Sequence, residues 1–157
     1  MTSQPGLGHL NGIIALSLAV RQRGHEVLAA GAPSVIAAFG RAGVPGEAVV
    51  DEPPGSDSQE TLDAVPELRR TPSTQRLTLV RAHVGIRTRA FALVDALPLL
   101  VDGWKPDLLL RDETELAAWV VAESRGIPDV SFEVSSHWPR RRWNAEVGAA
   151  LMELRTR

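Results

Sequence analysis

Apolar residues in the first fifty positions alternate between a broad helical pattern and short continuous runs. Over 10–23 they cover too wide a stripe for a surface helix, which predicts a largely buried one. Asn11 suits its N-cap, and Gly24 suits the position directly after its end. The elements predicted next are a strand over 25–30, a helix over 34–42 and a strand over 47–50.

The second half of the chain continues this alternation after one interruption. Prolines break the pattern over 51–72, where we expect a mobile loop. A long helical pattern covers 74–103, and Pro98 is expected to end or kink that helix. The elements predicted last are a strand over 106–110, a helix over 114–125, a strand over 129–134 and a helix that begins at 143. This alternation predicts one α/β domain over 1–157, built on a parallel sheet.

Composition and charge narrow the classes of function. A net charge of −2 offers no bulk electrostatic attraction for nucleic acid or for an anionic membrane. The chain has no cysteine, so disulfides and thiolate chemistry are excluded. It shows neither a signal peptide nor an apolar run long enough to span a bilayer. We therefore expect a cytoplasmic protein that binds neither nucleic acid nor membrane.

A glycine-rich segment, GLGHLNG over 6–12, places a histidine just before the first predicted helix. Glycine lets the backbone approach a ligand closely, and the imidazole of His9 belongs to the side-chain type that titrates near neutral pH. In open parallel sheets, ligands bind beyond the carboxyl ends of the strands, where the strand order reverses. Asp112 follows the 106–110 strand at that end. We expect His9 and Asp112 to form a pair that accepts a proton from an alcohol.

Each residue also has a structural interpretation. Asp112 followed by Glu115 fits a capping box for the next helix, and His9 needs only to hydrogen-bond within its own loop. The glycines of 6–12 also approach a dinucleotide-binding fingerprint. The second predicted strand, however, ends in AAGA over 29–32, without the acid that holds the ribose hydroxyls, which argues against NAD.

Five segments of the chain resemble one known family. They are QPGLGHLN at 4–11, RGHEV at 23–27, AGV at 42–44, KPDLLLRD at 105–112 and RGIP at 125–128. Together they resemble the start of family-one glycosyltransferases of the GT-B fold. The similarity is closest to the bacterial enzymes that glycosylate macrolides and other natural products.

This resemblance implies a Rossmann-like parallel sheet flanked by helices, the N-terminal half of a GT-B fold. It implies that His9 is the general base and that Asp112 orients it. The implied reaction is an inverting transfer of a sugar from a nucleoside-diphosphate sugar to a hydroxyl of a hydrophobic acceptor, without a metal. The residues expected to contact the acceptor are Gly8, Leu10, Asn11, His137 and Trp138.

The chain also departs from the family pattern. Gly12 stands where the family commonly has proline, and the first strand is truncated. The C-terminal domain, which binds the nucleotide sugar, is absent from 1–157. We therefore expect that this chain binds no cofactor itself and needs the second domain or a split partner for transfer. The alternative is a non-catalytic α/β module that binds a small hydrophobic ligand or a partner protein.

Overall fold

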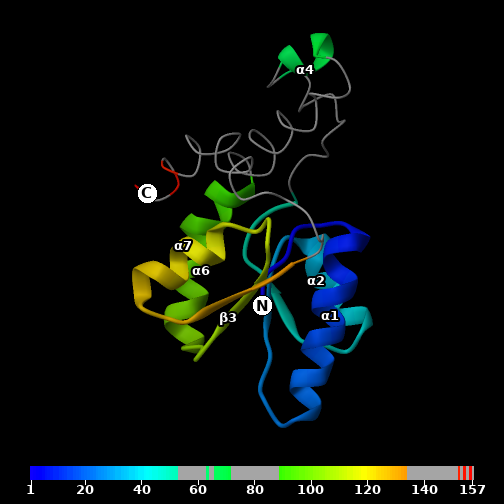
Figure 1. Ribbon diagram of the computed structural model, residues 1–157, viewed down its shortest axis with the longest axis vertical. Helices are drawn as coiled ribbons and strands as arrows, with labels where there is room; N and C mark the ends of the chain where they lie inside the picture. Colours follow the sequence, from blue (N-terminus) through cyan, green and yellow to red (C-terminus); the bar gives the residue numbers. More distant parts are fainter. Residues whose placement is uncertain are drawn as a thin grey trace.

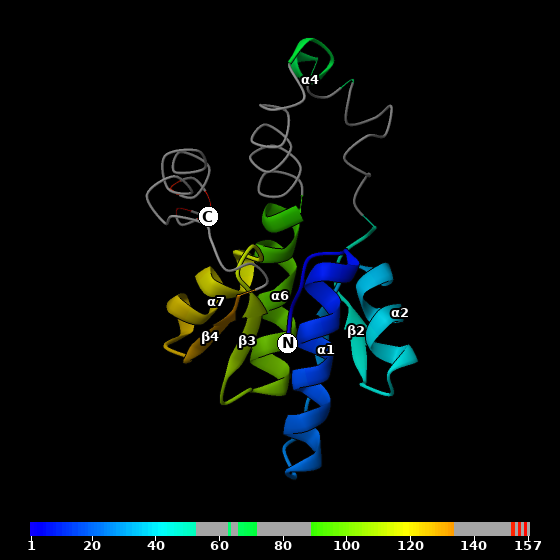
Figure 2. The same cartoon turned by 45° about the vertical axis from the view of Figure 1, so that its right-hand side comes forward.

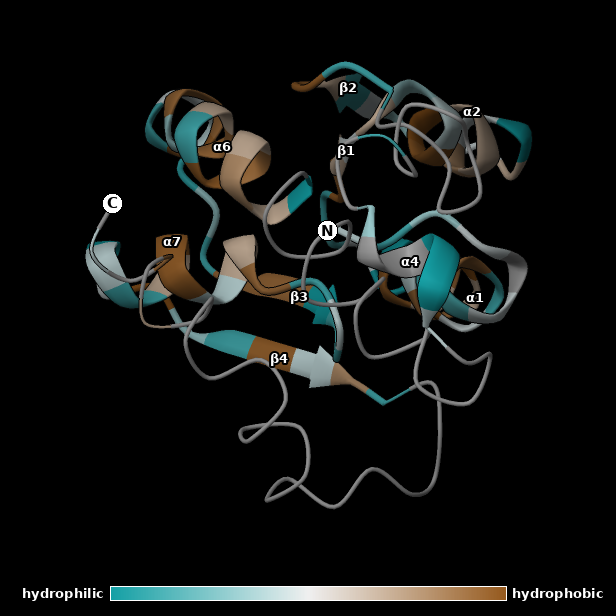
Figure 3. Ribbon diagram, turned by 90° about the horizontal axis from the view of Figure 1, so that it is seen from above, coloured by the Kyte–Doolittle hydropathy of each residue, from teal (hydrophilic) through white to brown (hydrophobic). Residues whose placement is uncertain are grey.

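The computed structural model describes residues 1–52, 63, 66–71, 89–133, 152, 154 and 156. Its helices are α1 (Leu7–Gln22), α2 (Pro33–Arg41), α4 (Glu67–Arg70), α6 (Phe91–Trp104) and α7 (Ala117–Arg125). Its strands are β1 (Ala29–Gly31), β2 (Gly46–Ala48), β3 (Leu109–Asp112) and β4 (Asp129–Phe132). Seen from above, the strands lie in a central layer, with α1 and α2 on one face and α6 and α7 on the other (Figure 3). Figure 1 shows the same arrangement from the side.

The first two residues join two pairs of parallel strands into one sheet. β1 pairs with β2, and β3 pairs with β4. Thr2 forms parallel bridges to both Ala30 and Arg111, so it lies between β1 and β3. The Thr2 amide donates to the Leu110 carbonyl at 2.9 Å, and the Ala30 amide donates to the Met1 carbonyl at 2.8 Å. The order is therefore β2, β1, the first residues, β3 and β4.

Successive residues of β1 and β3 point to opposite sides of the sheet, and each side carries an apolar cluster. Ala30 and Leu109 belong to the core cluster under α6 and α7. Their neighbours Ala29 and Leu110 belong to the cluster under α1 and α2, around Phe39. The parallel α/β sandwich expected from the sequence is therefore confirmed, and it is the Rossmann-like arrangement.

Helix α1 begins earlier than predicted. Its first residue is Leu7 and its N-cap is Gly6, so the prediction of Asn11 as N-cap was wrong. Gly6 adopts a φ of 142°, which favours glycine, and its carbonyl accepts the amide of Leu10 at 2.9 Å. His9 consequently lies in the first turn of a helix and not in the loop that precedes one.

Other boundaries also differ from the predictions. β1 begins only at Ala29, and α7 begins at Ala117, after a turn. α6 continues through Pro98, so the prediction that the helix ends there was wrong. A proline removes one backbone donor, and packing of α6 against the sheet and α7 outweighs that loss. Most of the predicted loop, the start of the predicted 74–103 helix and most of the last predicted helix lie outside the described residues.

Gly12 lies where α1 approaches the end of β4. A Cβ built on Gly12 would lie 2.6 Å from Cζ of Phe132, closer than such atoms pack. In α2, a Cβ on Gly40 would meet nothing within 4 Å. The structure therefore explains a glycine at position 12, where any side chain must displace the phenyl ring.

We expect Gly12→Ala to lower the free energy of unfolding by about 1 kcal/mol, because overpacking costs more than the gain in helix propensity. Gly40→Ala, the matched control, should raise it by about 0.5–1 kcal/mol. Urea unfolding of the 157-residue chain measures both. In a Phe132→Ala background, Gly12→Ala should become stabilising. Equal stabilisation by the two glycine substitutions in the wild-type background would contradict this packing argument.

Candidate active site

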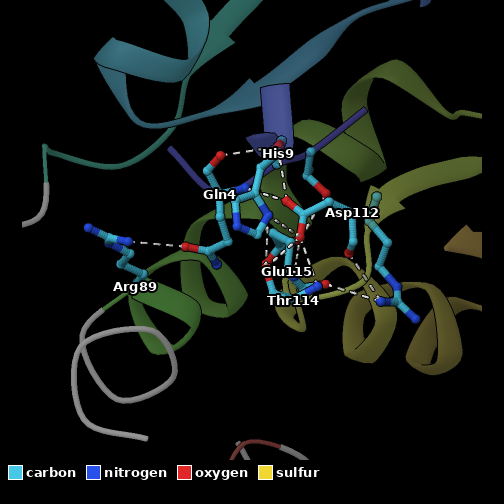
Figure 4. Close-up of polar contacts among 9 residues, drawn as sticks. Gln4, His9, Arg89, Asp112, Thr114 and Glu115 are labelled. Carbon is cyan, nitrogen blue, oxygen red and sulfur yellow. Dashed lines mark hydrogen bonds and ion pairs between the residues drawn. The ribbon is translucent and has the colours of Figure 1, made fainter. Parts of the chain in front are cut away.

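The start of α1 and the end of β3 bring His9 and Asp112 together. The strands run toward the end of the molecule at which α1 begins (Figure 2). Asp112 is the last residue of β3, and its Oδ1 lies 3.4 Å from Nδ1 of His9 (Figure 4). The aspartate side chain is fully buried, whereas 30% of the histidine side chain is exposed. The strand order thus produces the expected pairing; the chemical roles of the pair remain a prediction.

Five protein donors hold the Asp112 carboxylate. Its Oδ2 accepts the hydroxyl of Ser3 at 2.9 Å and the backbone amide of Gln4 at 2.5 Å. Its Oδ1 accepts the amide and the hydroxyl of Thr114 at 2.8 and 2.6 Å, and the amide of Glu115 at 3.1 Å. Because donors surround both oxygens, the carboxylate cannot rotate without losing hydrogen bonds.

These donors also determine the charge of Asp112. Burial alone would raise the pKa of its carboxyl group. Hydrogen bonds from His9, Thr114 and the Gln4 amide, together with the charge of a protonated His9, outweigh burial and lower the pKa to about 2. The group is therefore an anion at neutral pH, next to the imidazole.

Asp112 and Thr114 together determine which imidazole nitrogen carries the proton. The hydroxyl of Thr114 donates to Asp112 Oδ1 at 2.6 Å, so its oxygen is left to accept. That oxygen lies 3.4 Å from Nδ1 of His9. Nδ1 thus faces two acceptors, the hydroxyl oxygen and the carboxylate, which assigns its proton by the hydrogen-bond network. In this tautomer the lone pair is on Nε2, the nitrogen suited to act as a base.

Thr114 was not among the site residues predicted from the sequence. Its signal was the D-x-T spacing after a strand, because a threonine two residues after an aspartate often shares the turn that the aspartate forms.

Glu115, rather than Asp112, caps α7. Its Oε1 accepts the amide of Ala117 at 2.9 Å, and its Oε2 accepts the amide of Ala118 at 3.1 Å and the hydroxyl of Thr2 at 2.8 Å. Burial raises the pKa of Glu115, although these donors oppose the rise. The predicted capping box is therefore only half correct. Asp112 does accept the Glu115 amide, but the carboxylate that satisfies the first amides of the helix is that of Glu115.

A cavity of about 410 Å³ opens beside the pair. Its apolar wall includes Ala32, Val35, Val49, Val50, Leu93 and Ala96. Gln4 and Arg89 contribute polar groups. His9 is not among the described lining residues, but Gln4 connects the two places. Its amide binds Asp112, and its side-chain oxygen accepts from Arg89 (Figure 4).

The residues expected to contact the acceptor lie in different environments. Gly8 and Asn11 are exposed on the first turns of α1. Leu10 is 7% exposed and packs into the core beneath α1, away from the lining of the cavity. His137 and Trp138 lie outside the described residues. Acceptor contacts by these residues remain predictions.

The described residues show neither a metal centre nor a membrane-spanning helix. They contain no group of three or more histidine, aspartate or glutamate side chains placed to hold a metal ion. No helix among them has the length and apolarity needed to cross a membrane.

The fold is that of the N-terminal half of GT-B glycosyltransferases. The glycosyltransferase SnogD from Streptomyces nogalater superposes with a TM-score of 0.68 at 23% identity, covering 97% of this chain and 38% of that one. The spinosyn rhamnosyltransferase SpnG superposes with a TM-score of 0.65 at 23% identity, covering 98% of this chain and 39% of that one.

Residues 18–147 match the family described as erythromycin biosynthesis protein CIII-like, N-terminal domain, and the chain belongs to this family. L-demethylnoviosyl transferase from Streptomyces niveus is 33% identical over 129 residues, which are 82% of this chain and 32% of that protein. Elloramycin glycosyltransferase ElmGT from Streptomyces olivaceus is 33% identical over 134 residues, which are 79% of this chain and 33% of that protein. The chain spans about a third of the length of these relatives. Asp112 lies inside the family match, whereas His9 precedes it.

Proposed function

We propose that this chain is the acceptor-binding half of an inverting glycosyltransferase that acts on a hydroxyl group of a hydrophobic natural product. The observation that carries the proposal is the His9–Asp112 pair, whose network leaves the lone pair on Nε2, beside a mostly apolar cavity. The relatives are named as glycosyltransferases, which supports the same class. The solved structures of SsfS6 and SpnG in complex with thymidine diphosphate support a nucleoside-diphosphate sugar as donor.

In the proposed reaction, Nε2 of His9 takes the proton of the acceptor hydroxyl. The acceptor oxygen forms a bond to the anomeric carbon of the sugar, and the bond from that carbon to the diphosphate breaks. The nucleoside diphosphate leaves from the opposite face, so the configuration inverts. Asp112 remains an anion and stabilises the imidazolium that forms.

A second candidate function is a non-catalytic module that binds a small hydrophobic ligand. One observation favours it: the described lining of the cavity does not include His9. In that case the pair would serve only to anchor the start of α1 to the end of β3.

Sugar transfer by the chain alone and in a complete assembly separates these functions. The assembly joins the 157-residue chain to the nucleotide-sugar-binding domain of ElmGT, and mass spectrometry detects product from thymidine-diphosphate sugars and a panel of polycyclic acceptors. We expect product from the assembly and none from the chain alone.

Two outcomes would contradict the proposal. Product formed by the isolated chain would show that it is not half of an enzyme. Absence of product from an assembly that still binds thymidine diphosphate would favour the non-catalytic module.

A further inference from the structure

Arg89 presents an unsatisfied donor in the cavity. It lies two residues before Phe91, the first residue of α6, and lines the cavity. Its Nε is buried and has no hydrogen-bond partner within the described part of the chain. Its Nη1 donates to Oε1 of Gln4 over a long distance, 3.4 Å. A buried N–H without an acceptor is costly, so this position favours a ligand that brings an acceptor atom.

Two of the acidic groups around the same cavity, Glu52 and Glu115, already have other partners. Glu52 accepts the amide and the hydroxyl of Ser34 at 2.8 and 2.7 Å. Glu115 holds the start of α7. Asp51 also lines the cavity, so three carboxyl groups and one guanidinium surround it. This balance disfavours a negatively charged ligand group.

Burial also acts on the guanidinium itself. It lowers the pKa of Arg89, and the charge of Glu52 opposes that effect. The cation is thus incompletely solvated, which strengthens any hydrogen bond that a ligand oxygen accepts from it.

The rest of the cavity suits an apolar ligand body. The aliphatic side chains of Val35, Val49 and Leu93 form its walls. A volume of about 410 Å³ falls in the range of small-molecule sites, where an apolar lining carries a few placed polar groups.

We propose that this cavity binds the ring system of the acceptor and that Arg89 donates a hydrogen bond from Nε to a neutral oxygen of it, a ketone, quinone or phenol oxygen. This inference rests on the proposed function and specifies its substrate class. The Gln4 side chain contacts Arg89 and its amide contacts Asp112, so one residue connects the donor for the recognised oxygen with the partner of the proposed base. Arg89 is in this sense a specificity-determining residue.

The test uses three naphthalene probes that differ in one group: 2-acetylnaphthalene, 2-ethylnaphthalene and 2-naphthoate. Each is titrated into the 157-residue chain and followed by ¹H–¹⁵N NMR, which observes arginine Nε–H groups. We expect the ketone to bind about tenfold more tightly than the hydrocarbon and to shift the Arg89 Nε–H signal. The carboxylate should bind no more tightly than the ketone.

Two substitutions then test whether Arg89 causes the preference for the ketone. Arg89→Met should lower ketone affinity to that of the hydrocarbon, whereas Arg125→Met, which removes an exposed arginine paired with Asp102, should leave the ratio unchanged. Equal affinity for ketone and hydrocarbon, tightest binding of 2-naphthoate, or an unmoved Arg89 signal would each overturn the proposal. The wild-type signal keeps the test valid if Arg89→Met fails to fold.

Binding is measured here without donor or transfer. Loss of the proposed catalytic function would therefore leave this result unchanged, and failure of this test would leave the His9 base untouched.

Discussion

His9→Ala in the complete two-domain assembly is expected to lower kcat by about 10²–10⁴-fold, the usual contribution of a general base. Nδ1 of His9 faces Asp112 and Thr114, so its proton is held there, and in the proposed reaction Nε2 accepts the proton of the acceptor hydroxyl. Without the imidazole, the hydroxyl must attack while still protonated. Because the imidazole acts on the proton, the KM for the acceptor should change much less than kcat.

The matched control is His25→Ala, an exposed histidine beyond the other end of α1. We expect transfer within about twofold of the wild type for this variant. Initial rates of nucleoside diphosphate release measure transfer by both variants. Added imidazole should partly restore the rate of the His9→Ala variant and leave that of His25→Ala unchanged. Near-normal transfer by His9→Ala would show that the pair is scaffold.

Asp112→Asn is expected to lower the free energy of unfolding by about 2–4 kcal/mol. In the wild type, Oδ2 faces the donors of Ser3 and Gln4, and Oδ1 faces those of Thr114 and Glu115. An asparagine must place its NH₂ group against one of these sets of donors, whichever way it is turned. Urea unfolding of the 157-residue chain at pH 7 measures the loss. Transfer should also fall, because the tautomer of His9 is no longer held.

The acid dependence of this effect has a definite sign. The pKa of Asp112 is lowered in the folded state from 3.8 to about 2, which corresponds to roughly 2 kcal/mol of unfolding free energy. A lowered carboxyl pKa stabilises the folded state above pH 3.8. That contribution is lost as pH falls toward 2. The stability gap between wild type and Asp112→Asn should therefore narrow between pH 5 and pH 2.

Asp129→Asn is the control for the acid titration. Its carboxylate pairs with Arg111 at 2.9 Å and is 24% exposed, so we expect a loss of about 1 kcal/mol or less. A gap for Asp112→Asn that stays constant down to pH 2 would refute the assignment of a strongly lowered pKa.

Local signals in the sequence were sufficient for most helices and strands. The apolar run around Leu109 and Leu110 predicted β3, because both faces of a parallel strand are buried. Gly24, with a φ of 89°, follows α1 as its position predicted. The start of α1 was missed because Asn11 is a good N-cap by type, whereas the conformation of Gly6 determined where the helix began.

The pairing of His9 with Asp112 could be predicted from the sequence because the first strand and the 106–110 strand are neighbours in the usual doubly wound order. The orientation of that pair could not. It depends on the hydroxyl of Thr114, the hydroxyl of Ser3 and the amide of Gln4, which all donate to the Asp112 carboxylate. Ser3 and Gln4 are more than 100 residues away from Asp112 in the sequence. No local pattern encodes such a convergence.

By itself, then, the sequence determined the alternation of elements, the buried strands and the chemistry available at the end of the sheet. These follow from periodicity and turn preferences, which act between near neighbours. Only the tertiary structure decided the tautomer of His9, the capping of α7 by Glu115, the close approach of Phe132 to Gly12 and the unsatisfied donor of Arg89. Each depends on which distant side chains packing brings within a few ångströms, and on the donors and acceptors that burial leaves without water.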